Sequence, residues 1–402
     1  MKILVAGYPY IREYYLKTFD QYPEKDQLFF LLPKKWKAKR GQVIFNPPSR
    51  DNILTTKAYF YHSNYPILGG LLKGWMPALP LYIHRVFKKE KGILYSPSEP
   101  ILLTTLYQGI WAKIFGLKHI IFTWENIDYK DKFRGINWFI KKSILRLNLF
   151  FCDGVICGNE KAKKIFTKLT SKSLEVIPLS GVDTHFFKPC ESDFRKKYNL
   201  ESKIIFTFVG ALGYRKGIHL ILEAFGNVLK EINNAHLIVI GSGESEDYEN
   251  KLEETIKNFS LQNYITRMRW AEHKDLVEIL SASDVFLYPS ISYKGWEEQF
   301  GYSIAEAGLM KLPVISTKSG SIAEIIKDGE TGILIEQNST RELSAAMVAL
   351  GKDREMRIKL GENARSYISE RYANDLIADK FLEFFRSIYE KNNTNITKKI
   401  LS

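Results

Sequence analysis

The sequence predicts an α/β protein with two domains, each built on a parallel sheet. The first observation is length, because 402 residues exceed what one compact core normally holds and suit two domains of about 150–200 residues each. The second is the alternation of short apolar segments with longer amphipathic ones along almost the whole chain. The third is composition: 45% hydrophobic and 26% charged residues are typical of globular proteins. Together these observations exclude wholesale disorder and a fibrous repeat.

Apolar segments with the length of buried strands run through the first half of the chain. We expect strands at residues 3–6, 27–32, 43–45, 92–95, 119–123, 154–157 and 174–177. Stretches of helical length separate several of them, for example at residues 100–115 and 159–169. Strands joined by such long crossovers pair in parallel, so this order predicts a parallel sheet.

The same alternation restarts after a break. Alternating segments lie at residues 204–209, 220–231, 235–240, 248–258, 276–281, 285–288, 305–310, 313–316 and 333–335. The break at residues 180–192 contains Gly181, Pro189 and charged residues, which is typical of a linker. We expect helices from Arg341 to about Glu390, followed by a polar, frayed tail. A second α/β domain is therefore predicted.

Three features bear on the cellular compartment. The apolar run after Met1 and Lys2 ends at Gly7, which is too short for a signal peptide and fits a first strand. The stretch 65–83 is apolar apart from Lys73, but prolines and glycines interrupt it, so we expect no spanning helix. The cysteines neither suit a disulfide framework nor show a common zinc spacing; they are Cys152, Cys157 and Cys190. These features predict a cytoplasmic protein, at most held at the inner face of the membrane.

The positive charge is concentrated in the first half of the chain. Residues 1–190 hold 30 Lys and Arg against 14 Asp and Glu, whereas residues 191–402 hold 28 against 31. The net charge of +13 therefore belongs to the first half. Such a field attracts an anionic surface, a polyanion or a phosphorylated substrate.

Two basic segments of that half, residues 71–89 and 132–146, also carry large apolar and aromatic side chains. This composition suits an interfacial contact with an anionic membrane surface. It suits even better an ordinary helix with its apolar stripe on the core and its cations in water. RNA binding is the third interpretation, although the sequence shows no recognisable aromatic and basic nucleic-acid motif. Nucleic acid is therefore the least favoured partner.

Two glycine turns in the second half follow expected strands, where open parallel sheets bind their ligands. The segment 210–217 offers glycines, a following helix N-terminus and the cations Arg215 and Lys216, which together suit a diphosphate. It is neither a Walker A loop nor a dinucleotide fingerprint, and a solvated basic turn is the alternative. The second turn, at residues 241–243, is tight enough to pass beside a flat base.

A third loop contains Glu298 and leads into a helix that contains Glu306. If the helix begins at Gly301, Glu298 lies at its N-terminus and Glu306 in its second turn, so two carboxylates could hold two sets of sugar hydroxyls. The alternative is purely structural, because Ser303 and Glu306 have the spacing of a capping box, in which Glu306 accepts a backbone N–H.

Taken together, these motifs resemble the family 4 glycosyltransferases, retaining enzymes of the GT-B fold, over nearly the whole chain. The most specific piece is Glu298-Gln-Phe-Gly-Tyr-Ser-Ile-Ala-Glu306. Four further segments match family signatures in the family's order: residues 177–183, 281–290, 312–317 and 328–334. The resemblance implies two Rossmann-like domains whose parallel sheets face each other across an interdomain cleft.

The resemblance also implies a division of labour between the domains. Residues 1–182 would bind the acceptor and residues 183–375 the nucleotide sugar. A C-terminal helix at 376–392 would return to the first domain, and residues 393–402 would form the frayed tail.

On the donor side, the resemblance assigns the catalytic roles to three residues. Arg215 and Lys216 would neutralise the departing diphosphate, and Glu298 would bind the donor sugar's hydroxyls. Glu306 would hold the ribose, and Trp270 would either stack on the base or belong to the core. The donor-binding residues implied are Gly210, Gly241, Trp270, Phe300, Gly301, Tyr302 and Glu306.

On the acceptor side, the implied residues follow strands of the first domain; they are Gly7, Glu99, Trp124 and Glu125. The chain departs from many relatives at two places. Ala211 stands where they have arginine, so the phosphate charge would rest on Arg215 and Lys216 alone. Trp124 and Glu125 stand where they have a histidine, which indicates a different acceptor.

The implied reaction moves a sugar from a UDP- or GDP-linked donor to a hydroxyl, with retention and front-face attack. No Asp-x-Asp occurs and the histidines lack metal-ligand spacing, so we expect neither metal nor cofactor. A basic acceptor domain suits a glycan or lipid-linked acceptor. The competing hypothesis is a peripheral membrane- or RNA-binding protein on an inactive scaffold of this fold.

Overall fold

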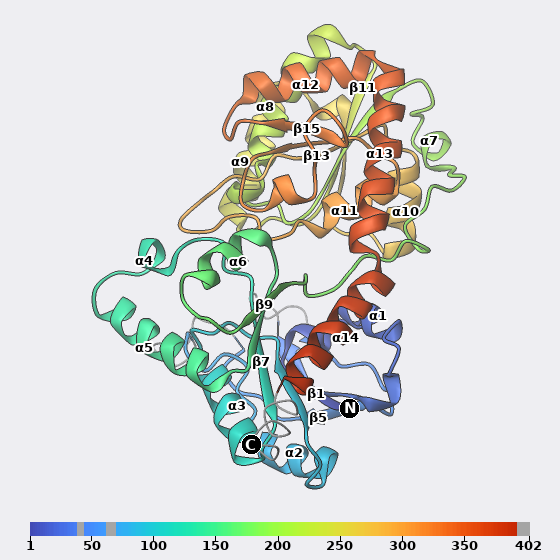
Figure 1. The fold of residues 1–402 in the computed structure, drawn as a ribbon. Coiled ribbons are helices and arrows are strands. Elements are labelled where there is room, and N and C mark those ends of the chain that lie inside the picture. The colour runs from blue at the N-terminus through green and yellow to red at the C-terminus, as the bar shows by residue number, and fades with distance from the viewer. Residues whose placement is uncertain (38–43, 62–69, 392–402) are drawn as a thin grey trace. The chain divides into compact units, whose positions relative to one another are not determined.

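The computed structural model describes residues 1–37, 44–61 and 70–391. Contacts between residues divide the chain into two compact units. Unit 1 comprises Met1–Gly181 and the segment from Asn374 onward, and unit 2 comprises Val182–Ala373. Figure 1 shows the two units with their helices and strands labelled. The division places the last helix, α14 (Asn374–Glu390), in unit 1.

Unit 1 is built on a seven-stranded, wholly parallel sheet in its described residues. The strands lie in the order β5 (Ile53–Thr56), β2 (Leu28–Pro33), β1 (Lys2–Ala6), β6 (Gly92–Ser96), β7 (Lys118–Thr123), β8 (Gly154–Cys157) and β9 (Ser173–Val176). Side chains alternate along β1, with Ile3 and Val5 on one face and Leu4 and Ala6 on the other. Both faces are buried, which explains the continuously apolar strand sequences.

Helices cover both faces of this sheet. The helices of unit 1 are α1 (Glu13–Asp20), α2 (Leu79–Phe87), α3 (Leu103–Ile114), α4 (Tyr129–Lys132), α5 (Gly135–Phe151), α6 (Glu160–Thr167) and α14. α1 and α14 share one core with Ile3 and Val5, where Phe381 of α14 lies 5.0 Å from Phe19 of α1 between ring centroids. α2 packs on the opposite face beside Leu4.

Unit 2 repeats the architecture with a six-stranded parallel sheet in its described residues. The order is β12 (Ile265–Met268), β11 (Ala235–Ile240), β10 (Ile204–Val209), β13 (Val285–Tyr288), β14 (Val314–Thr317) and β15 (Gly332–Ile335). Its helices are α7 (Phe194–Lys197), α8 (Ile218–Glu231), α9 (Glu246–Asn258), α10 (His273–Ser281), α11 (Tyr302–Leu309), α12 (Thr340–Lys352) and α13 (Arg354–Tyr372). β10 lies between β11 and β13, so the loops after β10 and β13 emerge side by side at the carboxyl edge.

The predicted fold class is confirmed, with two parallel sheets covered by helices. Two short, partly buried strands, β5 and β12, were not predicted. The strand expected at residues 43–45 does not join the parallel sheet. Instead β4 (Ile44–Phe45) pairs antiparallel with β3 (Trp36–Lys37), and Val43 lies outside the described residues.

Two other sequence expectations concern regions only partly described. In the apolar stretch 65–83, residues 65–69 lie outside the described part, and the segment from Leu79 forms the nine-residue helix α2. Within the described ranges, no helix has both the length and the apolar character needed to cross a membrane. The predicted frayed tail at residues 393–402 also lies outside them.

Candidate active site

The loop after β10 is held against the segment that follows β13. It ends in the short 3₁₀ turn Tyr214–Lys216, and Gly217 then begins the first turn of α8. Gly217 has φ +70°, and a Cβ there would lie only 2.0 Å from the carbonyl oxygen of Pro289. Glycine permits both the left-handed backbone and the close approach. The preceding residue, Lys216, therefore lies against the end of β13 and the segment that follows it.

Lys216 is buried in that position, with 7% of its surface exposed. Its Nζ donates hydrogen bonds to the hydroxyl of Tyr288 and to Oε2 of Glu298, the latter at 2.5 Å. Burial lowers the pKa of Lys216, and the charge of Glu298 opposes that shift. A buried ion pair at the carboxyl edge of the sheet is the result.

Glu298 is fixed by groups from two neighbouring loops. The hydroxyl of Ser290 lies 3.2 Å from its Oε2, and the N–H of Ser321 donates to its backbone carbonyl at 2.9 Å. Gly320 has φ +57°, and a Cβ on it would fall 2.0 Å from the same carbonyl oxygen. The loop after β14 therefore packs against the backbone of Glu298 and supports it. The sequence analysis missed this support, although the Ser-Gly-Ser run at 319–321 directly follows a strand.

Arg215 lies beside Lys216 but is more exposed. Its Nε donates to Glu244 at 3.1 Å, and its guanidinium carbon lies 4.2 Å from the ring centroid of Trp296. The ring of Trp296 is also 5.1 Å from Nζ of Lys216, so one indole contacts both cations. Glu244 and Trp296 were missed by the sequence analysis, because nothing local in the sequence links them to the basic turn.

The helix that carries Glu306, α11, begins directly after Gly301, as the sugar-binding interpretation of Glu298 and Glu306 required. Gly301 is its N-cap, with φ +79°, and Ser303 already lies inside α11. Because no side chain caps this helix, the capping-box interpretation of Ser303 and Glu306 is wrong. Glu306 is buried in the second turn, and its charge contributes to raising the pKa of Tyr288, behind burial and Glu298.

The remaining predicted donor residues lie along the same edge. The N–H of Gly210 donates to Ile240 at 3.0 Å, and a Cβ on Gly241 would meet the carbonyl oxygen of Gly210 at 1.8 Å. The two glycines thus hold the ends of β10 and β11 close together. Trp270 is 72% exposed, so the alternative that placed it in the core is wrong.

The turn before α11 places aromatic rings at the start of the helix. Phe300 is buried, and its ring centroid lies 4.7 Å from that of Tyr302 and 5.2 Å from that of Tyr372. Gly301 separates the two aromatic residues of the turn and supplies its left-handed backbone.

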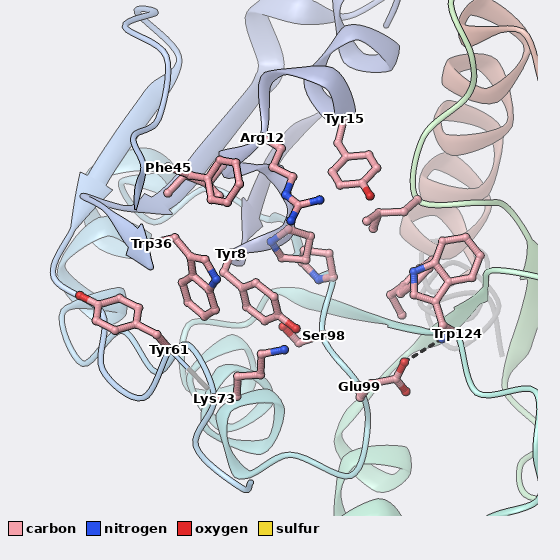
Figure 2. Close-up of a pocket in the computed structure, with 15 residues that line it drawn as sticks. Tyr8, Arg12, Tyr15, Trp36, Phe45, Tyr61, Lys73, Ser98, Glu99 and Trp124 are labelled. Atoms are coloured by element: carbon pink, nitrogen blue, oxygen red, sulfur yellow. Dashed lines mark hydrogen bonds between the residues drawn. The ribbon is translucent and has the colours of Figure 1, made fainter. Parts of the chain in front are cut away.

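Unit 1 contains a separate cavity of about 430 Å³ at the carboxyl ends of its strands. Figure 2 shows its aromatic and charged lining. Two of the residues expected on the acceptor side, Glu99 and Trp124, line this cavity. Gly7 is not in the lining, although a Cβ on it would lie 2.7 Å from the lining residue Pro97. Glu125 does not line the cavity; it is buried and pairs with Lys132 at 2.7 Å.

Glu99 is the acidic residue among the described residues that line the cavity. Burial raises its pKa to about 7, and the nearby charge of Glu125 adds to the rise. The backbone N–H of Trp124 and the hydroxyl of Thr123, both at 2.8 Å, stabilise the carboxylate and limit that rise. Glu99 therefore changes its charge near neutral pH.

Comparison with known proteins identifies a family for the second half of the chain. Residues 191–367 match the model of the family described as Glycosyl transferases group 1. The match assigns residues 191–367, which lie within unit 2, to this family. The predicted family and the enzyme class, glycosyl transfer, are thereby confirmed. No group of three or more His, Cys, Asp or Glu side chains suited to a metal ion occurs within the described ranges.

Relatives of this group 1 glycosyltransferase match at low identity. The capsular polysaccharide biosynthesis glycosyltransferase CapM of Staphylococcus aureus is 23% identical over 268 residues, which span 64% of this chain and 68% of CapM. The uncharacterized glycosyltransferase MJ1069 of Methanocaldococcus jannaschii is 26% identical over 388 residues, spanning 92% of this chain and 94% of that protein. Alignments with several other curated relatives span only 49% to 59% of their lengths.

The fold has close counterparts among solved structures. Anabaena HepE, crystallised in complex with UDP, superposes with a TM-score of 0.75 at 20% identity, covering 96% of this chain and all of HepE. At that identity the likeness establishes the fold, which is GT-B, as predicted.

Proposed function

We propose that this group 1 glycosyltransferase transfers a sugar from a UDP- or GDP-linked donor to a hydroxyl group of a glycan or lipid-linked acceptor. The observation that carries the proposal is the pair of adjacent cations at the carboxyl edge of unit 2, with Lys216 buried and Arg215 held on Trp296. A diphosphate gains most from fixed positive charge in a site that excludes water. The presence of UDP in the HepE complex supports a nucleoside diphosphate at this edge.

The donor residues divide between holding the nucleotide and holding the sugar. Arg215 and Lys216 face the diphosphate, with the N-terminus of the 14-residue helix α8 immediately behind them. Glu298 and Glu306 supply carboxylates that accept hydrogen bonds from the donor sugar's hydroxyls and from the ribose. Gly210, Gly241 and Trp270 flank the place of the base.

The proposed chemistry is a front-face displacement with retention. The bond between the anomeric carbon and the phosphate oxygen breaks, and the acceptor oxygen bonds to the same face of that carbon. The acceptor's proton passes to the departing phosphate oxygen, so no separate protein base is required. Arg215 and Lys216 stabilise the negative charge that develops on the diphosphate, and they are already in place before the reaction.

A thermal-shift panel tests this function. The full chain is heated with UDP, GDP, ADP and their sugar conjugates, since a ligand that binds only the folded state raises the melting temperature. We expect a selective rise with one nucleotide, lost in Lys216→Ala and retained in Lys274→Ala, whose lysine is 75% exposed in the same unit. A rise that Lys216→Ala leaves unchanged would contradict the assignment.

A further inference from the structure

Among the described residues, the cavity of unit 1 is lined by more cationic than acidic side chains. Glu99 is the single acidic residue among the described residues that line it, whereas Arg12 and Lys73 both line it as cations. Neither cation forms an ion pair with an Asp or Glu anywhere in the described part of the chain. This contrasts with Arg50, which lies on the same unit and pairs with both Glu13 and Asp20.

Aromatic rings hold these two cations in place. Nζ of Lys73 lies 4.6 Å from the ring centroid of Tyr8, and the guanidinium carbon of Arg12 lies 4.8 Å from that of Phe45. Figure 2 shows Arg12 and Lys73 on either side of Tyr8. Contacts with ring faces orient a cation without neutralising it, so both charges remain available to a ligand.

The cavity is also lined by a cluster of aromatic rings. The rings of Tyr8 and Trp36 are stacked, with centroids 4.3 Å apart and planes inclined by 8°. Tyr61 packs edge-on against Trp36, with the two ring centroids 5.2 Å apart. Trp36 covers one face of Tyr8 and Nζ of Lys73 lies over the ring, so the parts of these rings that reach the cavity supply rigid apolar contact area for a sugar.

Resting on the proposed function, we infer that this cavity binds an acceptor sugar that carries an anionic group, a phosphate or a carboxylate. Arg12 and Lys73 hold the anion, and the stacked pair Tyr8 and Trp36 contacts the sugar ring. Arg12 suits either oxyanion, because its guanidinium can donate two parallel hydrogen bonds. Glu99, on the side of Trp124, accepts hydrogen bonds from sugar hydroxyls.

Calorimetric titration of the full chain tests the inference. The probes are glucose 6-phosphate, glucuronic acid and the neutral methyl glucoside, each in the presence of the nucleotide that the thermal-shift panel identifies. We expect at least one charged probe to bind about tenfold tighter than methyl glucoside, since a charge-assisted hydrogen bond is roughly twice as strong as a neutral one. Which charged probe binds tighter distinguishes phosphate from carboxylate.

Matched variants separate this inference from the function on which it rests. In Arg12→Gln/Lys73→Met the preference for the charged probes should vanish, while Arg85→Gln/Lys91→Met, two exposed cations outside the lining, should retain it. Nucleotide binding should be equal in both variants. Equal affinity for charged and neutral probes, no binding of any probe, or a preference that survives Arg12→Gln/Lys73→Met would overturn the inference. A missing nucleotide shift would instead contradict the proposed function.

A second, independent observation concerns helix α5, which is apolar on two opposite faces. One face is buried in the core through Ile144, Leu145 and Leu149. The other is exposed, and its side chains recur at the spacing of one helix face. The exposed face comprises Ile136, Phe139, Ile140, Leu147 and Phe150, of which Ile136 and Phe150 are 73% and 74% exposed.

The helix packed against α5 also carries exposed apolar side chains, and cations lie beside the exposed face of α5. α3 packs against α5 and adds the exposed Ile110 and Ile114, and Figure 1 shows the two helices adjacent in unit 1. α5 contains no acidic residue, and Lys142 and Arg146 are exposed at the edge of its apolar face. The first half of the chain also carries the excess of positive charge.

We propose that this face of α5 and α3 docks on an anionic bilayer. The apolar side chains enter the boundary between headgroups and acyl chains, and Lys142 and Arg146 contact anionic headgroups. A lipid-linked acceptor would thereby be brought to the enzyme at the membrane surface.

Vesicle sedimentation tests the docking. We expect the full chain to pellet with vesicles of phosphatidylcholine and phosphatidylglycerol at low salt, and far less with phosphatidylcholine alone or at high salt. Phe139→Ser/Phe150→Ser should abolish pelleting, whereas Leu81→Ser, on another helix and 73% exposed, should not. Absence of pelleting would overturn the proposal. So would a concentration-dependent dimer that Phe139→Ser/Phe150→Ser dissociates, because a second copy would then cover the face.

Discussion

The two sites handle positive charge in opposite ways. In unit 2, Lys216 is buried and forms an ion pair with Glu298, and Arg215 pairs with Glu244. In unit 1, Arg12 and Lys73 line their cavity over aromatic rings, without a carboxylate partner among the described residues. Paired cations stay fixed and charged before a ligand arrives, which suits the stabilisation of a transition state. Unpaired cations attract a ligand anion directly, which suits binding.

The largest expected effect comes from removing the paired cation of unit 2. Lys216→Ala should lower release of nucleoside diphosphate from the donor by about 10²-fold or more, because a preorganised charge at the leaving group is lost. The measurement is the initial rate with the nucleotide sugar chosen by the thermal-shift panel. Circular dichroism should show a folded chain. A folded variant with near-full activity would remove Lys216 from the mechanism.

A glycine that supports the partner of Lys216 should have the next largest effect. Gly320→Ala would place a methyl group 2.0 Å from the carbonyl oxygen of Glu298, at a φ of +57°. We expect the displaced carboxylate to lower the rate by about tenfold or more. Separately, a left-handed alanine should lower the free energy of unfolding by about 1–2 kcal/mol. Gly329→Ala is the control, since it has φ +73° but open space around it. Equal losses in the two variants would mean that backbone strain alone is responsible.

Arg215 should matter less than Lys216, because its side chain is 28% exposed and water screens its charge. We expect Arg215→Gln to reduce the rate by about tenfold. Arg267→Gln provides a control with the same exposure, in a surface pair with Glu253 on the same unit. If the two arginine variants behaved alike, the basic turn would have no special relation to the donor.

The smallest expected effect is a pH dependence in unit 1. The pKa of Glu99, raised to about 7, means that Glu99 is neutral below pH 7 and negative above it. The other groups that act on Glu99 are Glu125, which raises its pKa, and Lys132, which lowers it. Tyr129, also nearby, has a raised pKa because it is buried, and so stays neutral in this range.

Glucuronic acid keeps a constant charge between pH 6 and 8, because an ordinary carboxyl has a pKa of about 4. Its affinity should therefore fall by about threefold as the pH rises through 7 and Glu99 becomes a like charge. Glu99→Gln should flatten this profile, and methyl glucoside should show no such decrease. An affinity that rises with pH would contradict the charge assignment of the cavity.

Elements with strong local patterns could be predicted from the sequence. The strands around residues 3–6 and 204–209, and the helix beginning at Ile218, carry continuous apolar runs or amphipathic periodicity, and they occur close to the expected bounds. β12 was missed because all four of its residues are only partly buried, which leaves no apolar run to detect.

The sequence could predict which residues belong to the candidate site, but not which of them contact one another. Lys216 and Glu298 are separated by 82 positions, and only the adjacency of β10 and β13 in the sheet brings them together. The roles of Gly320 and Trp296 depend in the same way on contacts between loops. Likewise, no local pattern could reveal that Arg12 and Lys73 lack carboxylate partners, because that depends on which residues fold around them.

The most direct test of the central claim compares nucleotides with their nucleosides by calorimetry. If Arg215 and Lys216 hold a diphosphate, the full chain should bind UDP or GDP about 10²-fold or more tighter than the matching nucleoside. That difference should collapse in Lys216→Ala and persist in Lys274→Ala. Equal affinity for nucleotide and nucleoside, or a difference that Lys216→Ala leaves intact, would contradict the account.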